Sequence, residues 1–462
     1  MLTTTGERLV DYSDTLEVRL VRRLKMVVDS FIHQPNGSIA QACESIEATK
    51  GAYRFFDNER VRHGGIIKAE SQATWAAVIK DKPKRVIVAQ DTTDLDYSHH
   101  PATEGLGQLE NEHMQGLLVH SALTISEQGL PIGLAGQQVW ARSAETSGKR
   151  HKRKERLIED KESMKWLNGL PDVPEAVKAN GTTAVMVSDR ESDVYELLLA
   201  CSQRPELEAV IRASWNRALT DGKNQHLFEA VRAQPVLHNY PLHVQATATR
   251  SEREALLSVR FTTVTLRPPK RPQGSPDLPA LTIGIVEAVE AQPPTGQKAI
   301  HWLLLTTLPL NTVEDALTVI RYYTYRWLIE RFHFVLKSGC RIEQRQLQTA
   351  DRLQRLLAVF SVVAWSLLLL THLARLSPDA PASLALSDNQ WRALAAYKNR
   401  STKPLAQPTL HQAVRWIAQL GGFLGRNSDG DPGVKTLWQG WQRLHDITQT
   451  WILFNPSPTT YG

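Results

Sequence analysis

The stretch RVIVAQDTTD, at residues 85–94, marks the point where the sequence pattern changes from helix to strand. Its run of apolar, mostly β-branched residues is typical of a buried strand, and this strand is expected to end at Asp91. Upstream, apolar residues such as Leu20 and Leu24 recur at helical spacing. Residues 1–80 are therefore predicted to form a helical N-terminal domain, followed by a domain that contains a sheet.

Downstream of this stretch, the pattern predicts a mixed α/β core over residues 81–215. Apolar runs bounded by Gly, Pro or polar clusters predict further strands, with helices between some of them. The expected strands cover 116–125, 129–140, 183–189 and 208–213, and a helix is expected over 193–201. Asp193 would then lie in the first turn of that helix, where an acidic side chain interacts favourably with the helix dipole.

The second half of the chain first returns to strands and then becomes helical. A Pro-rich loop at 267–279 interrupts the strand-like segments, and we interpret residues 216–310 as an inserted β subdomain. The expected strands of this insert are 243–249, 256–266, 281–289 and 301–308. The helical pattern after Asn311 predicts a second part of the core over 311–377 and a helical C-terminal domain over 378–462.

Composition narrows the class of protein. The chain has 462 residues, 42% of them hydrophobic, which is enough for a large core and several domains. Its net charge of +6 makes a polyanionic partner plausible. The three cysteines, Cys43, Cys201 and Cys340, match neither a disulfide framework nor a zinc site, and the N-terminus lacks the pattern of a secretion signal. We therefore expect a protein of the reducing cytoplasm.

One apolar stretch, residues 356–370, resembles a membrane span because basic residues flank it. A span needs about 20 apolar residues, and this stretch is shorter and contains Ser361 and Ser366. We interpret it as a buried core helix, and no membrane partner is expected.

Two aspartates follow predicted strands of the core. Asp91 ends the first strand, and Asp189 ends the strand at 183–189. The carboxyl ends of strands in an α/β sheet form the crevice where ligands usually bind. A single aspartate in such a place more often caps a turn or a helix, but two in one core favour a site for a hard cation, which prefers oxygen ligands.

The segment RYYTYRWLIERFHFVLKSG, at residues 321–339, predicts a helix with an unusual polar stripe. On a continuous helix, Tyr323, Arg326, Glu330 and Lys337 would fall within an arc of roughly 60°, beside an apolar face. The ordinary interpretation is an i,i+4 pair of Arg326 and Glu330 on a solvated surface. The alternative, which the two strand-end aspartates favour, is a carboxylate flanked by phosphate-binding groups.

These features together resemble those of the DDE transposases, more narrowly the cut-and-paste transposases of bacterial insertion sequences in family four. The resemblance covers most of the chain. Besides the helix at 321–339, it is carried by GAYRF at 51–55, QDTTDLDY at 90–97, SDRESD at 188–193, HWLLLTTLP at 301–309 and AQLGGF at 418–423.

The resemblance implies a ribonuclease H-like catalytic core in which Asp91, Asp189 and Glu330 bind two Mg²⁺ ions, with Mn²⁺ able to substitute. It also implies DNA-binding roles for several further residues. Those residues are Tyr323, Arg326 and Lys337 at the cleaved DNA end, Trp302 as a base-stacking residue, and Arg212 near the DNA. From its sequence context alone, Trp302 opens an apolar strand and would be assigned to the core.

The predicted function is a DNA transposase that binds terminal inverted repeats as a homodimer, cleaves through a hairpin and inserts the DNA into a target. A bacterial, nucleoid-associated location follows from that function. Two alternatives remain, a related nuclease or junction resolvase that does not join strands and a catalytically silent DNA-binding protein. The basic run KRHKRK at 149–154 is either a solvated loop or a contact to the DNA backbone.

Overall fold

The computed structural model divides the chain into two compact units. Unit 1 contains residues 1–80, 92–147 and 328–462, and unit 2 contains residues 81–91 and 148–327. The structure describes residues 5–13, 16–111, 113–142, 161–220, 226–244, 252–271, 276–401, 406–426 and 429–455. The basic run at 149–154 lies outside these described residues.

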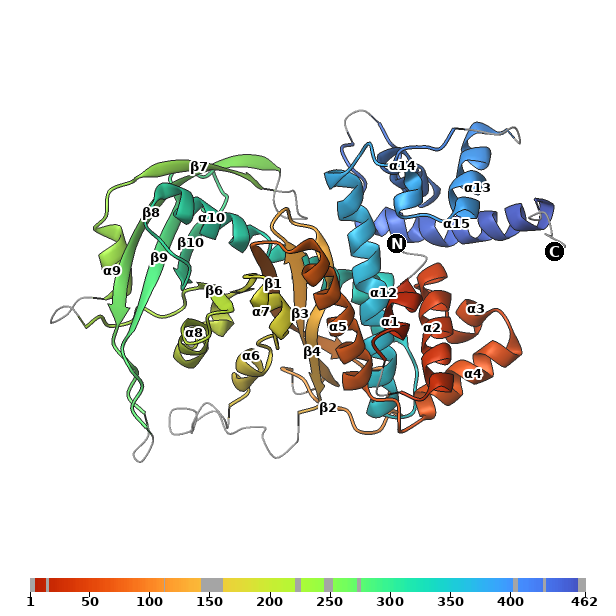
Figure 1. Cartoon of the computed structure of the whole chain (residues 1–462), viewed down its shortest axis with the longest axis horizontal. Helices are drawn as coiled ribbons and strands as arrows, with labels where there is room; N and C mark the ends of the chain where they lie inside the picture. The colour runs from red at the N-terminus through yellow and green to blue at the C-terminus, as the bar shows by residue number, and fades with distance from the viewer. Residues whose placement is uncertain are drawn as a thin grey trace. The chain divides into compact units, whose positions relative to one another are not determined.

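The N-terminal part of unit 1 is helical, as the apolar spacing predicts (Figure 1). Side chains begin two of the helices: Ser38 forms a capping box with Gln41, and Ser45 accepts a hydrogen bond from the Ala48 backbone N–H. The helices are α1 (Thr5–Val10), α2 (Val18–His33), α3 (Ile39–Cys43), α4 (Ile46–Asp57) and α5 (His63–Asp81).

The apolar stretch at 356–370 lies within helix α12 (Ala350–Leu376), which is long and apolar enough to cross a membrane. Its most apolar window is 94% buried inside unit 1, so the prediction of a core helix is confirmed. Two buried arginines link the N-terminal helices to this region. Arg355 donates to the Val61 and Phe56 carbonyls, and Arg345 donates to the carbonyls of Pro35 and Gly37.

The C-terminal part of unit 1 is also helical, with α13 (Asp388–Asn399), α14 (Leu410–Leu420) and α15 (Val434–Phe454). Helices α14 and α15 pack very closely because glycines stand at their contact. A Cβ atom at Gly440 would lie 1.7 Å from the Ile417 carbonyl oxygen, and one at Gly421 would lie 1.9 Å from the Thr436 carbonyl oxygen. These positions therefore require glycine for steric reasons.

Unit 1 also contains the β-strands β2 (Gly107–Gln108), β3 (Gln115–Ser126) and β4 (Pro131–Trp140). Strands β3 and β4 form an antiparallel pair with register shifts after Ala122 and Thr124. Both correspond to predicted strands.

The cysteines Cys43, Cys201 and Cys340 are buried and free, in agreement with the expectation of no disulfide framework.

Unit 2 is built on a mixed sheet with the strand order β1-β5-β6-β10-β9-β8-β7 (Figure 1). The first strands are parallel: β1 pairs with β5, and β5 pairs with β6. The following pairs are antiparallel. The strands are β1 (Arg85–Asp96), whose last residues belong to unit 1, β5 (Thr183–Ser188), β6 (Leu207–Arg212), β7 (His238–Val244), β8 (Arg253–Leu266), β9 (Leu281–Glu290) and β10 (His301–Thr306).

The strands of the predicted inserted β subdomain continue this sheet. Strand β10 pairs with β6 on one side and with β9 on the other, so hydrogen bonds join the strands of 216–310 to the core strands. Strand β7 begins at His238, five residues before the strand predicted at 243–249, and residues 245–249 of that prediction lie outside the described residues. Strand β7 lies at the end of the sheet order and is largely exposed, so it lacks the apolar alternation that would reveal it.

The helices of unit 2 pack on this sheet, with α8 against β6, α9 against β8 and β9, and α10 against β5, β6, β9 and β10. Their bounds are α6 (Met164–Asn168), α7 (Glu175–Ala179), α8 (Tyr195–Ser202), α9 (Leu227–Arg232) and α10 (Val313–Thr324). A capping box of Thr312 and Asp315 begins α10, which confirms the predicted helix start after Asn311.

Unit 1 is predicted to lose stability when the pH falls from 6.5 to 5. Burial lowers the pKa of His63 to about 4, of His333 to about 3 and of His372 to about 4. In the unfolded chain these histidines bind protons near pH 6.5, so protonation favours unfolding. In this pH window, each histidine lowers the free energy of unfolding by about 1.4 kcal/mol per pH unit. Urea unfolding at pH 7, 6 and 5 measures the effect. A free energy of unfolding that stays constant over this range contradicts the prediction.

Candidate active site

Asp91 and Asp189 stand at equivalent positions of neighbouring parallel strands. Asp91 lies inside β1, which continues to Asp96, so the prediction that this strand ends at Asp91 is wrong, whereas Asp189 directly follows β5. The last registered pair of β1 and β5 is Ala89 with Val187, and each aspartate stands two residues further along its strand direction. Neighbouring strands lie about 5 Å apart, so the two carboxylates belong to the same edge of the sheet. The apolar residues before each aspartate are almost completely buried, which fixes both strands in the core of unit 2.

The surroundings of Asp189 explain how it is held at this edge. It is the N-cap of the short 3₁₀ segment η5 (Arg190–Ser192), and its Oδ1 accepts a hydrogen bond of 2.9 Å from the Glu191 backbone N–H. Ser192 donates to the Asp189 carbonyl oxygen at 2.7 Å. The side chain is half-buried. Capping thus orients the carboxylate and uses one of its oxygens, and the capping role is compatible with a ligand role for the other oxygen.

Glu330 lies in the other unit. It is an exposed residue in the first turn of α11 (Trp327–Phe334), and unit 1 resumes at Leu328, whereas both aspartates belong to unit 2. Within the described ranges, no group of three or more His, Cys, Asp or Glu side chains is placed to hold a metal ion. The strand register brings Asp91 and Asp189 together within unit 2, whereas Glu330 belongs to unit 1.

The polar segment 321–339 is not one continuous α-helix, so the predicted single stripe is wrong. Helix α10 ends at Thr324, and Tyr325 and Arg326 form a turn before α11 begins. Both turn residues donate backbone hydrogen bonds of 3.1 Å to the third residue before them, which tightens the chain as in a 3₁₀ turn. After α11, residues Val335–Gly339 form a π-helical turn, η6, which contains Lys337.

The side chains of Trp302, Tyr323 and Arg326 form an aromatic–cation cluster within unit 2. The rings of Trp302 and Tyr323 meet edge to face, with centroids 5.1 Å apart, and the Arg326 guanidinium lies 6.0 Å from the Tyr323 ring centroid. Tyr323 is buried, but Trp302 is only half-buried, so its assignment to the core from sequence context alone is wrong. This cluster offers an aromatic ring, a phenol and a cation in one place, a combination that can bind a nucleotide.

Lys337 and Arg212 both make contacts inside the protein. The Lys337 ammonium lies 3.5 Å from a carboxylate oxygen of Glu343 in unit 1, and Glu343 also accepts a hydrogen bond from the Asp96 backbone N–H. Arg212, at the end of β6, donates to the His301 carbonyl oxygen at 2.8 Å. Among the described residues, the buried Nε of Arg212 has no hydrogen-bond partner.

The sequence did not reveal the position of Asp193. Asp193 precedes α8, whose N-cap is Val194, and the Asp193 side chain is completely buried. Its Oδ2 accepts hydrogen bonds from the backbone N–H groups of Ser214 and Trp215, and Arg217 pairs with its Oδ1 at 2.6 Å. The predicted helix-dipole role was therefore wrong. No spacing in the sequence signals this contact, because its partners come from a loop after the next strand.

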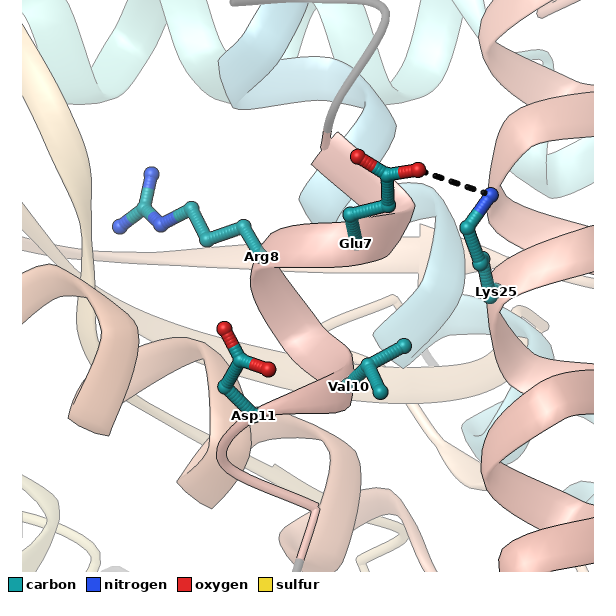
Figure 2. A pocket seen from close by; sticks show the side chains of 5 residues that line it. All are labelled: Glu7, Arg8, Val10, Asp11 and Lys25. Carbon is teal, nitrogen blue, oxygen red and sulfur yellow. Dashed lines mark ion pairs between the residues drawn. The ribbon is translucent and has the colours of Figure 1, made fainter.

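Unit 1 has a surface hollow near its N-terminus that contains none of the predicted site residues. Figure 2 shows Glu7 facing Lys25 across it, with Val10 and Asp11 below. Lys25 also pairs with Asp29 at 2.9 Å, and Arg8 points away to donate to Thr74. Because Glu7 and Lys25 form an ion pair across it and the family resemblance places no site residue there, this hollow does not compete with the aspartate edge as the catalytic site.

Comparison with protein-family models finds three matches. The model described as Transposase DNA-binding matches residues 10–61, Transposase DDE domain matches residues 162–365, and Transposase Tn5 dimerisation domain matches residues 362–450. The DDE match includes Asp189 and Glu330 but begins after Asp91. Enzymes of this family cleave and join DNA with divalent metal ions. The chain therefore belongs to the DDE transposases and resembles that of Tn5: it is a DNA transposase with DNA-binding, catalytic and dimerisation segments.

Proposed function

We propose that Asp91, Asp189 and Glu330 are the catalytic carboxylates of a cut-and-paste transposase. The observation that carries this proposal is the equivalent placement of Asp91 and Asp189 on neighbouring parallel strands. Glu330 is the third member because it lies within the DDE match, next to the turn that holds Arg326. Asp91 lies before that match, so its assignment depends on the strand register.

The donor set fits Mg²⁺, and Mn²⁺ in its place, because both are hard cations that prefer carboxylate oxygens. Asp189 supports this fit, since its cap occupies only Oδ1 among the described hydrogen bonds. When bound, two such ions would activate the attacking oxygen and stabilise the leaving one. The chain's own contribution is to fix the carboxylates at one edge of a rigid sheet.

The other proposed residues position the DNA. Arg326 presents a planar fork that matches a phosphate, and Lys337 presents a point charge. Tyr323 supports Trp302 through their edge-to-face contact, which leaves the half-buried indole able to stack on a base. We assign Arg212 a position near the DNA, where it holds the His301 carbonyl oxygen next to Trp302 in the sequence; its Nε is buried.

In the proposed reaction, a water oxygen bonds to the scissile phosphorus and the 3′ oxygen leaves as a hydroxyl. That hydroxyl attacks the opposite strand, which closes a hairpin and releases the flanking DNA. A second water opens the hairpin, and the 3′ hydroxyl then joins the element to target DNA. Each step exchanges one phosphorus–oxygen bond for another, so the same carboxylates serve throughout.

The remaining assignments concern the domains of the chain. We assign recognition of the terminal inverted repeats to residues 1–80, a ribonuclease H-like core to 81–215 and 311–377, a β insertion to 216–310, and dimerisation in the synaptic complex to 378–462. This organisation agrees with the order of the three family matches along the chain. The site of action would be the bacterial nucleoid.

Incubation of the purified full-length protein with Mg²⁺ and DNA that carries the element's own ends tests this proposal. We expect nicked, hairpin and excised products, followed by joining to a target plasmid. Cleavage without joining would select a nuclease or resolvase instead. Binding to the ends with no metal-dependent cleavage would select a catalytically silent DNA-binding protein.

A further inference from the structure

Trp215 is a prominent exposed ring near the proposed catalytic edge. Its side chain is 64% exposed, and among the described residues of unit 2 it is the one aromatic side chain that is largely exposed. A single exposed ring does not by itself require a partner, so its position decides: at the proposed catalytic edge, a flat indole can stack on a base. In the sequence, Trp215 is an isolated tryptophan with no motif around it.

The sheet places Trp215 close to the proposed ligands. Strands β5 and β6 are parallel neighbours, and the last registered pair is Ser188 with Ile211. Asp189 therefore leaves β5 at the same edge at which the chain leaves β6 and enters the loop of Ser214 to Arg217. Trp215 belongs to the connection one strand away from the Asp189 carboxylate.

The loop that carries Trp215 is held firmly by the rest of unit 2. Asp193 accepts the Ser214 and Trp215 backbone N–H groups at 2.7 and 2.9 Å. On the far side, the Asn216 side chain accepts from the Phe228 N–H and donates to Glu229. Because Asp193 follows Asp189 by one short turn, the same segment that carries the proposed ligand also fixes the loop.

We infer that Trp215 stacks on an unpaired base of the DNA strand next to the cleaved phosphate, and that Asp193 is the residue that positions it. A tryptophan on a fixed backbone has only two side-chain torsions to order on binding, so it suits this role. Every base offers a π-face, so such a contact needs no particular sequence. This inference depends on the proposed function, because it assumes that cleavage takes place at the aspartate edge.

The test uses the full-length protein and a duplex of the element's terminal sequence, with 2-aminopurine in turn at each position flanking the cleavage site. EDTA prevents cleavage, so binding and fluorescence quenching are read without chemistry. We expect Trp215→Ala to weaken binding about tenfold and to remove the quenching at one position, while Trp215→Phe stays within about threefold of the wild type. Leu237→Ala, an exposed apolar side chain beside β7, is the control and should bind as the wild type does.

Two results would overturn the inference. In the first, Trp215→Ala binds the DNA and quenches 2-aminopurine as the wild type does. In the second, Trp215→Ala changes the oligomeric state of the protein in the absence of DNA, which would show that the ring contacts another protein chain. Thermal unfolding of each variant verifies that it is folded. If the proposed function itself is wrong, the wild-type protein will not cleave DNA in Mg²⁺. That result is independent of the binding and quenching measured in EDTA.

Discussion

Asp189→Asn is expected to lower the rate of metal-dependent DNA cleavage by about a thousandfold or more, which is roughly 4 kcal/mol in the activation barrier. Asparagine is as good an N-cap as aspartate, so the hydrogen bond from the Glu191 N–H is retained and the fold stays intact. The negative charge that a cation needs is lost. Single-turnover cleavage of a labelled DNA end in Mg²⁺ measures the rate, and binding to the same DNA in EDTA should be unchanged.

Glu191→Gln is the matched control for this variant. Glu191 is two residues away, its side chain is 59% exposed, and it pairs with Lys165. This change removes a charge of the same sign from the same segment but keeps a side-chain oxygen that can accept a hydrogen bond from the buried Lys165 ammonium, so it should leave the cleavage rate within about twofold of the wild type. Full activity of Asp189→Asn would show that the residue serves only as a helix cap.

Asp193→Ala is expected to destabilise unit 2 by about 3 to 5 kcal/mol. The substitution leaves the Arg217 guanidinium without its carboxylate partner and leaves the N–H groups of Ser214 and Trp215 without an acceptor. Urea unfolding followed by circular dichroism should show a transition at clearly lower urea concentration.

Asp172→Ala, at an exposed position of the same unit, controls for the loss of an acidic side chain and should unfold as the wild type does. The two aspartates of SDRESD thus have opposite expected phenotypes. The Asp189 variant is stable and inactive, and the Asp193 variant is unstable. An Asp193→Ala protein that unfolds at the wild-type urea concentration would contradict the structural role assigned to this carboxylate.

The sequence predicted the core strands well because their signal is local. Long apolar runs before Asp91 and Asp189 can form little other than buried strands. The end of the apolar run gave the end of β5 to within one residue, but β1 continues five residues beyond its predicted end at Asp91. The exposed strand β7 gave no such signal, and its start at His238 was not predicted. The sequence also gave no reason to expect that β10 joins the later strands to the core sheet.

The candidate site was less predictable because it depends on contacts between distant segments. The prediction that the polar residues of 321–339 share one helix face assumed a continuous α-helix. Instead, the chain turns at Tyr325 and Arg326, and a π-helical turn follows α11. The partners of Asp193 lie more than twenty residues away, in a loop that no periodicity reveals. The placement of Glu330 relative to the aspartates depends on two compact units, which spacing along the chain does not specify.

The most direct test of the central claim is anomalous diffraction at the manganese edge from crystals of the full-length protein bound to its DNA end and Mn²⁺. We predict manganese peaks in contact with carboxylate oxygens of Asp91, Asp189 and Glu330 together, at metal–oxygen distances of about 2.0 to 2.3 Å. Manganese that is bound with any one of these three side chains turned away from the ions would contradict the account.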